Sequence, residues 1–134
     1  MTSLTAILYR SAALTAEGSP EDRAILDISR RNNAARSITG FLYREDDVFY
    51  QWLEGPDRAV SDTFDAIRAD PRHTGVRELG RHPVAARNFR LWSMGHTDRR
   101  TMSLFDWAAD NRIVLNAVSP SQILTFLRHC ARRG

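Results

Sequence analysis

The segment Val48-Phe49-Tyr50-Gln51-Trp52-Leu53-Glu54-Gly55 constrains the fold more than any other part of the chain. It has the pattern of a buried strand, and strand alternation places Gln51 on the same face as Phe49 and Leu53. A long amide on an apolar face needs hydrogen-bond partners, because burying it unpaired costs on the order of a few kcal/mol. In the strand predicted at Thr5-Ala6-Ile7-Leu8-Tyr9, the Tyr9 hydroxyl shares a face with Ile7. Two polar groups on strand faces favour a shared ligand.

The first half of the chain alternates strand and helix patterns. A strand is predicted from Leu4 to Tyr9, and Ser19-Pro20-Glu21-Asp22 then supplies an N-cap, a first-turn proline and early acids for a helix. The inward face of that helix carries Ile25 and Ile28. We expect it to end near Asn32-Asn33, because asparagine tolerates the left-handed conformation that ends helices.

A hairpin and a second helix follow. The hairpin is predicted at Ile38 to Tyr43 and Val48 to Leu53, joined through Glu45-Asp46-Asp47. Gly55-Pro56 opens the helix and Asp70-Pro71 ends it. Its apolar stripe is Val60, Phe64 and Ile67.

Two more strands, around Val76 to Val84 and Leu91 to His96, complete a βαββαββ pattern. This order predicts a ferredoxin-like α+β sandwich, with two helices on one face of a mainly antiparallel sheet. Right-handed crossover makes the first and third strands neighbours. Tyr9 and Gln51 are therefore expected side by side beneath the helices.

Beyond residue 98 the pattern changes to two short helices. Met102, Leu104, Phe105 and Trp107 mark the first, Ser119-Pro120-Ser121-Gln122 forms a capping box for the second, and Ile123, Leu127 and Cys130 form its stripe. We expect residues 1–98 to form the core domain and residues 99–134 a helical cap over the open sheet face. The alternative is that the stripe, beside Arg128, Arg132 and Arg133, forms a contact with a partner or a second copy.

Composition excludes several classes of function. The 134 residues carry a net charge of +3, but no lysine is present and the arginines are interspersed with acids, so specific nucleic-acid binding is not expected. A single cysteine, Cys130, excludes an internal disulfide, and no Cys/His cluster has zinc spacing. No apolar run approaches the ~20 residues of a membrane span, and the N-terminus lacks a signal-peptide pattern. These features predict a cytoplasmic protein without a metal site.

Short motifs of the chain resemble the BLUF domains, the flavin-binding sensors of blue light. The resemblance is collinear and covers about residues 3 to 98. It rests on Tyr9-Arg10-Ser11, Ser29-Arg30-Arg31-Asn32-Asn33, Ile38-Thr39-Gly40, Phe49-Tyr50-Gln51-Trp52-Leu53-Glu54-Gly55, Asp70-Pro71-Arg72-His73 and Trp92-Ser93-Met94.

The resemblance implies a role for each matching residue. FAD is expected to bind non-covalently between the two helices, with FMN or riboflavin replacing it in a heterologous host. The residues implied to contact the cofactor are Ile25, Ser29, Asn32, Asn33, Gln51, Ile67, Arg72 and His73. Within that set, Asn33 bonds the carbonyl and imide edge of the ring, and Ile25 and Ile67 enclose it. The photoactive network implied is Tyr9, Gln51 and Ser29, with Trp92 and Met94 on the output strand.

The resemblance also implies a photoreceptor that is not an enzyme. Light would move an electron and a proton from Tyr9, and the hydrogen bonds of Gln51 would then switch and red-shift the flavin absorption. Because the sequence ends after two short helices, we expect a short stand-alone protein. Its output is expected through an unidentified partner protein or self-association as a homodimer, with no membrane involved.

Each of these residues also has an ordinary structural interpretation. Tyr9 suits a sheet edge, Gln51 an unpaired backbone group, and Asn33 a helix C-cap. Ser29 suits a bond to a helix carbonyl, Ile25 and Ile67 the core, Trp92 and Met94 a half-buried strand, and His73, His82, His96 and His129 surface loops.

Other classes of function share this fold. A flavin-using oxidase or an acylphosphatase-like hydrolase is the main alternative, although Ser11-Ala12-Ala13-Leu14 is not a glycine-rich anion loop. An RNA-binding sheet would need a glycine-and-aromatic strand signature that this chain lacks.

Overall fold

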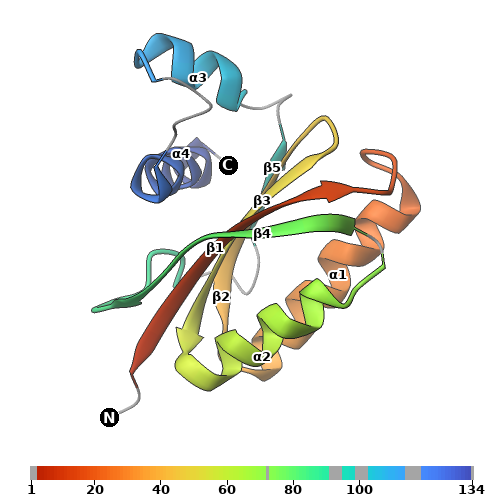
Figure 1. The fold of residues 1–134 in the computed structure, drawn as a ribbon, viewed down its shortest axis with the longest axis vertical. Coiled ribbons are helices and arrows are strands. Elements are labelled where there is room, and N and C mark those ends of the chain that lie inside the picture. The colour runs from red at the N-terminus through yellow and green to blue at the C-terminus, as the bar shows by residue number, and fades with distance from the viewer. Residues whose placement is uncertain (1–2, 72, 91–94, 99–102, 114–118, 134) are drawn as a thin grey trace.

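The computed structural model describes residues 3–71, 73–90, 95–98, 103–113 and 119–133 (Figure 1). The elements run in the order β1 (Leu4–Ala13), α1 (Pro20–Ala35), β2 (Thr39–Glu45), β3 (Val48–Pro56), α2 (Asp57–Arg68), β4 (His73–Val84), β5 (Gly95–Asp98), α3 (Leu104–Asp110) and α4 (Pro120–Arg133). This order confirms the predicted ferredoxin-like α+β sandwich.

The five strands form one sheet in the order β4-β1-β3-β2-β5. β1 pairs antiparallel with both β3 and β4, so the predicted contact between the first and third strands is confirmed. β1 continues four residues past the predicted end at Tyr9, because Ala12 still pairs with Val48 on one side and Ala13 with His73 on the other. β5 pairs parallel with β2 at the opposite edge, and the last two residues of the predicted strand 91–96 begin it, while residues 91–94 lie outside the described residues.

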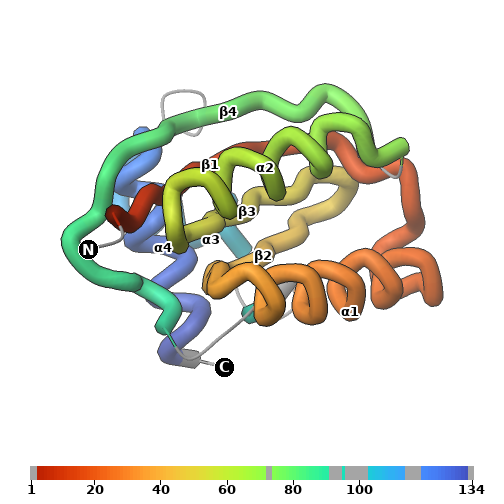
Figure 2. The backbone as a smooth tube through the Cα atoms, turned by 90° about the horizontal axis from the view of Figure 1, so that it is seen from below, coloured from red at the N-terminus to blue at the C-terminus, as the bar shows by residue number. Residues whose placement is uncertain are grey.

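Strand alternation gives each face of the sheet its own apolar core. On one face Ile7 and Tyr9 pack with Val60 and Phe64 of α2. Figures 1 and 2 show α1 and α2 across this face, with α3 and α4 on the opposite side of the sheet. The second core joins Ala6, Leu8, Phe41, Tyr43 and Trp52 of the sheet to Phe89, Leu104, Ile123, Phe126, Leu127 and Cys130.

Both ends of α1 are fixed by specific contacts. Ser19 caps it as predicted, with its hydroxyl accepting from the Asp22 amide at 3.2 Å. The predicted end near Asn32-Asn33 is wrong, since the helix continues to Ala35 and the left-handed residue is Ser37, with φ of 58°. The Asn33 carbonyl accepts from the Ile38 amide at 2.8 Å, which turns the chain directly into β2.

The C-terminal helices cover the sheet face that α1 and α2 leave open. The predicted capping box is confirmed, because the Ser119 amide donates to Gln122 Oε1 at 2.9 Å and the Gln122 amide donates to Ser119 Oγ at 3.2 Å. The stripe Ile123, Leu127 and Cys130 is at most 3% exposed. The alternative in which this stripe meets a partner is therefore wrong, because the stripe is already packed against the chain's own sheet.

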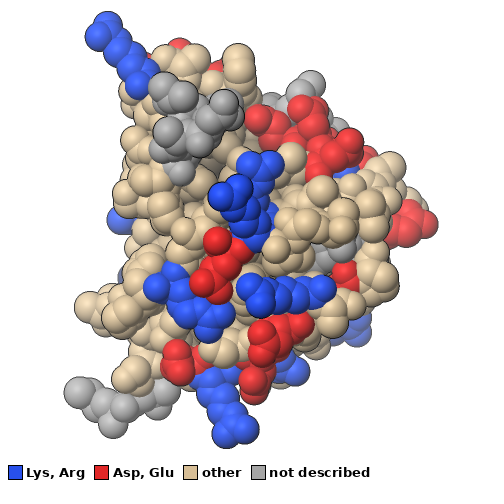
Figure 3. Space-filling view, in the orientation of Figure 1, with Lys and Arg blue, Asp and Glu red and all other residues tan. Residues whose placement is uncertain are grey.

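The surface mixes charges of both signs. Figure 3 shows arginine and acidic side chains interspersed on one face, and on β4 Arg81 and Glu78 form an ion pair at 2.9 Å. The prediction that the histidines lie in loops is wrong, since His82 and His96 are strand residues and His129 is in α4. Among the described residues, no helix is long and apolar enough to cross a membrane.

Candidate functional site

Tyr9 of β1 and Gln51 of β3 lie directly opposite each other in the antiparallel register. Both face α1 and α2, and they are 2% and 4% exposed. The Tyr9 hydroxyl donates a hydrogen bond to Gln51 Oε1. The pair predicted from strand alternation is thus present, and it meets the need of the buried amide for a partner.

The Tyr9 phenol is held as a neutral donor. Its ring packs against Phe64 of α2, with the ring centroids 5.4 Å apart. Burial raises the pKa of Tyr9 well above its ordinary value, and the negative charge of Asp70 raises it further. The hydroxyl therefore keeps its proton at neutral pH and presents it to Gln51.

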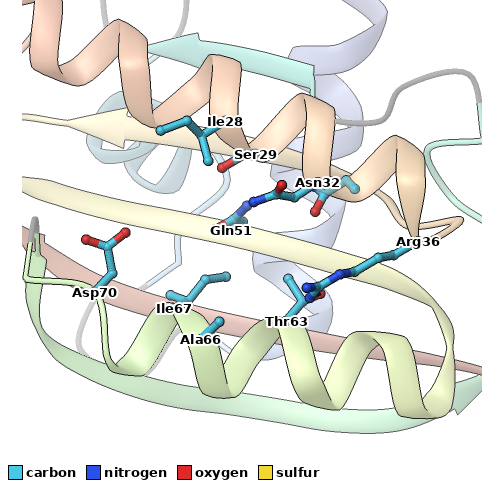
Figure 4. A pocket seen from close by; sticks show the side chains of 10 residues that line it. Ile28, Ser29, Asn32, Arg36, Gln51, Thr63, Ala66, Ile67 and Asp70 are labelled. Atoms are coloured by element: carbon cyan, nitrogen blue, oxygen red, sulfur yellow. Dashed lines mark hydrogen bonds between the residues drawn. The ribbon is translucent and has the colours of Figure 1, made fainter.

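A cleft of about 120 Å³ lies between α1 and α2, with Gln51 at its base (Figure 4). The two walls of the cleft are the faces of α1 and α2 that point toward each other above β3. The lining residues are Ile28, Ser29, Asn32, Asn33 and Arg36 from α1 and its C-cap, Gln51 from β3, and Thr63, Ala66, Ile67 and Asp70 from α2 and the turn after it.

One end of the cleft is bridged by a polar contact between its walls. Arg36 Nη1 donates to the Thr63 hydroxyl at 3.1 Å, and Figure 4 shows the arginine reaching across toward α2. The buried Asn33 lies one turn earlier on α1. The contact between Arg36 and Thr63 therefore sets the spacing of α1 and α2 close to Asn33, which the sequence resemblance assigned to flavin binding.

The lining chemistry suits a flat ring with polar edges. Ile28 on α1 and Ile67 on α2 offer apolar contact from opposite walls, as Figure 4 shows. The amides of Gln51, Asn32 and Asn33 each combine donors with an acceptor, so they match both carbonyl and imide groups.

The structure brings together most of the described residues predicted for the site. Ser29, Asn32, Asn33, Gln51 and Ile67 all line the cleft, and Tyr9 lies behind Gln51. Ile25 is half-buried on α1 but is not among the lining residues, and Ile28, three residues on, takes that place. Arg72, Trp92 and Met94 lie outside the described residues, as does the side chain of His73.

The sequence did not single out Arg36, Thr63, Ala66 and Asp70 as site residues. Thr63 lies four residues before Ile67 and so shares its face of α2, whereas Ala66 is the residue directly before Ile67. Helical spacing was the signal available for Thr63. Arg36 carried no such signal, because its place depends on how far α1 continues.

The fold and the cleft define a class: a ferredoxin-like α+β domain with a ligand site between its two helices. The sequence model of the family described as sensors of blue-light using FAD, the BLUF family, matches residues 4–95. This match covers more than half of the chain, and the chain belongs to that family. The resemblance predicted from the motifs is confirmed.

Known relatives include proteins several times longer than this chain and one of similar length. Photoactivated adenylate cyclase subunit beta of Euglena gracilis is 34% identical over 105 residues, which are 78% of this chain and 12% of that protein. The blue light- and temperature-regulated antirepressor BluF of Escherichia coli (strain K12) is 34% identical over 97 residues, 72% of this chain and 24% of that protein. The dark-state structure of BlrB, a BLUF protein, has a TM-score of 0.82 and 31% identity over 98% of both chains. The chain thus spans only a small part of both curated relatives.

The residues present fit the cofactor named by the family. BLUF domains bind FAD as their chromophore, and its isoalloxazine ring is planar with carbonyl and imide groups along one edge. The cleft offers apolar walls, amides that match such an edge, and the Tyr9 hydroxyl behind one of those amides.

Proposed function

We propose that this chain is a blue-light photoreceptor that binds FAD non-covalently between α1 and α2 and turns over no substrate. The hydrogen bond from Tyr9 to Gln51 at the base of the cleft carries the proposal. A buried donor and a buried amide are placed where a bound ring would meet the amide directly. Family membership supports the same assignment.

The contacts to FAD are assigned by combining the sequence with the cleft. Asn32 and Asn33 bind the polar edge of the ring, Ile67 supports one face, and Ile25 together with Ile28 supports the other. The sequence resemblance alone assigns Arg72 and His73 to the carbonyl at the far side of the ring. Ser29 lines the same wall of α1 and completes the hydrogen-bonding set.

The photochemistry depends on the states of Tyr9 and Gln51. When bound, FAD supplies a ring that absorbs blue light and becomes a strong oxidant. Tyr9 would give an electron and its phenolic proton to the photoexcited ring and would then take both back, so no net oxidation would remain. During this cycle the Gln51 amide would rotate or tautomerise and present a donor where it had an acceptor. In that state the Gln51 NH2 group would donate to a carbonyl of the bound ring, and this hydrogen bond would red-shift the absorption.

The signal leaves through protein contacts in this proposal. The sequence assigns Trp92 and Met94 to the output strand, and the partner is another protein or a second copy of this chain. A domain boundary near residue 98 and a cytoplasmic location also stay predictions from the sequence.

An absorbance spectrum of the purified protein tests the proposal. We expect a yellow protein carrying FAD, or FMN or riboflavin from a heterologous host, whose spectrum shifts reversibly to the red under blue light. A flavin-using oxidase would also be yellow but would show no such shift without substrate. A colourless protein that takes up no added flavin after refolding would refute the proposal.

A further inference from the structure

Glu54, at the end of β3, is a fully buried carboxylate with four hydrogen-bond donors around it. Its Oε1 accepts from the Trp52 indole at 2.9 Å and from the Asn88 amide at 2.8 Å. Its Oε2 accepts from the Thr39 hydroxyl at 2.8 Å and from the Phe89 amide at 2.7 Å. A carboxylate has about four acceptor positions, so each of them is used.

Arg87, which directly precedes Asn88 and Phe89, binds both β3 and the end of α1. Its Nη1 donates to the Thr39 hydroxyl at 2.9 Å and to the Glu54 carbonyl at 3.3 Å. Its Nη2 donates to the Ser37 carbonyl at 2.7 Å, just past the end of α1. Residues 87–89 are therefore held both to β3 and to the helix end that follows Asn33.

This segment lies between the cleft and the C-terminal cap. Gln51 and Glu54 belong to the same strand, three residues apart, and strand alternation turns them to opposite faces of the sheet. Phe89 packs in the core shared with α3 and α4, and its ring lies 5.5 Å from that of Phe41. In the chain, residues 87–89 precede β5, which pairs with β2.

We propose that Glu54 is a positioning residue of the photosensor, which fixes residues 87–89 to the strand carrying Gln51. A change at Gln51 then shifts this segment together with β3 and reaches β5 and the C-terminal helices. The inference rests on the proposed function, since it requires that light changes the hydrogen bonds of Gln51. It assigns Glu54 no contact with the flavin.

The variant Glu54→Gln tests the role at constant size. An amide offers one oxygen and one NH2 group, so one side of the carboxylate becomes a donor. In the better orientation the NH2 group takes the place of Oε2. The Thr39 hydroxyl can turn to accept from it, but the Phe89 amide then faces another donor. The opposite orientation would set two donors, the Trp52 indole and the Asn88 amide, against the NH2 group.

Hydrogen exchange in the dark gives the first measurement and needs no photochemistry. We expect the Phe89 amide to exchange ~10- to 100-fold faster in Glu54→Gln, because it loses a bond to a charged acceptor. The matched control is Glu17→Gln, which removes an exposed carboxylate from the loop before α1. Unchanged exchange at both Asn88 and Phe89 would overturn the proposal.

The light-minus-dark exchange difference gives the second measurement. In the wild type and in Glu17→Gln we expect a difference in β5 and α3. In Glu54→Gln we expect the red shift to persist while that difference falls at least ~3-fold. A purely structural role would lower the midpoint of unfolding and leave the difference in place. An undiminished difference in Glu54→Gln, or none in a wild type that red-shifts normally, would overturn the proposal.

Arg87→Met is the second variant, in case Glu54→Gln does not fold. It removes the bonds to Thr39, Glu54 and Ser37 but leaves the carboxylate and its donors intact. We expect the same loss of the light-minus-dark difference, with the red shift retained, and an undiminished difference would overturn the proposal. A wild type without a red shift would instead refute the proposed function, and the dark measurement would still decide whether Glu54 holds residues 87–89.

Discussion

Arg44 offers the sharpest test of what holds α1 against the sheet. Its side chain is fully buried on β2, and its Nη1 lies 2.8 Å from the Asp22 carboxylate in the first turn of α1. Nη2 donates to the Thr15 carbonyl at 2.6 Å, and Nε donates to the Asp46 carbonyl at 2.8 Å. The guanidinium also lies over the Phe49 ring at 5.1 Å. Arg44 thus ties the start of α1 to the β2–β3 hairpin.

We predict that Arg44→Met lowers the free energy of unfolding by about 3 to 5 kcal/mol. The methionine fills much of the space, so the cost comes mainly from charge and hydrogen bonding. Asp22, whose side chain is only 11% exposed, would keep a negative charge without its cation. The Thr15 and Asp46 carbonyls would lose their donors as well.

The matched control is Arg58→Met, which removes the cation of an exposed pair. Arg58 lies 3.9 Å from Asp62, and their side chains are 95% and 63% exposed. Pairs of this kind contribute at most about 0.5 kcal/mol. Urea unfolding followed by circular dichroism measures both variants. Equal losses in the two would refute the argument from burial. Adding Asp22→Asn to Arg44→Met should recover part of the loss, because the unpaired charge is then gone.

Three further predictions concern the site and the sheet. Tyr9→Phe and Gln51→Leu should each keep flavin bound and abolish the red shift, and a normal photocycle in Gln51→Leu would contradict the mechanism. Gly40→Ala should disrupt the β2–β3 pairing and lower the melting temperature, because its Cβ would meet the Trp52 carbonyl, and an unchanged melting temperature would contradict this. Burial raises the pKa of the Cys130 thiol from 9.0 to about 12, so the unfolded thiol ionises first. The free energy of unfolding should then fall by up to about 1.4 kcal/mol per pH unit from pH 9 upward. Cys130→Ala should remove that share of the decline, and an identical slope in this variant would contradict it.

The central pair of the site was predictable from the sequence. Alternation placed Tyr9 and Gln51 on one face of their strands, and the connection rules made those strands neighbours. These two arguments depend only on local pattern and chain order. The opposed register confirms both.

The boundaries of the site depended on contacts that local sequence does not display. Asn33 is typical of a helix end, but here it is buried and its carbonyl meets the Ile38 amide, so α1 continues and Arg36 reaches Thr63. Similarly, the stripe on α4 is equally suited to a partner or to the chain's own sheet. The apolar face of β1 and β2 opposite α1 and α2 decides between them, because α4 packs on it.

Buried charges were the feature hardest to predict. Arg44 and Glu54 occupy strand positions where sequence pattern favours an exposed charge, yet both are fully buried. Several of their partners lie far along the chain, such as Thr15 for Arg44 and Phe89 for Glu54. Only the tertiary structure shows that these charges hold α1 and residues 87–89 in place.

A different carboxylate, that of Glu45, fastens the C-terminal helical cap to β2. Its Oε1 accepts from the Tyr43 hydroxyl at 2.9 Å and from the Ser103 hydroxyl and the Leu104 amide at 3.0 Å each. These contacts fix the start of α3 to the end of β2, and none of them involves the strand that carries Gln51.

Because of this difference, we expect the light-minus-dark exchange difference to respond to substitution of Glu54 but not of Glu45. Glu45→Gln should raise amide exchange in α3 by a similar factor in the dark and in the light, because it weakens the docking of α3 without changing how β3 is linked to residues 87–89. The light-minus-dark difference in β5 should remain as in the wild type, and hydrogen exchange of both states measures it. If that difference disappears in Glu45→Gln as fully as in Glu54→Gln, the signal does not depend on β3 alone, and docking of the cap as a whole must carry it.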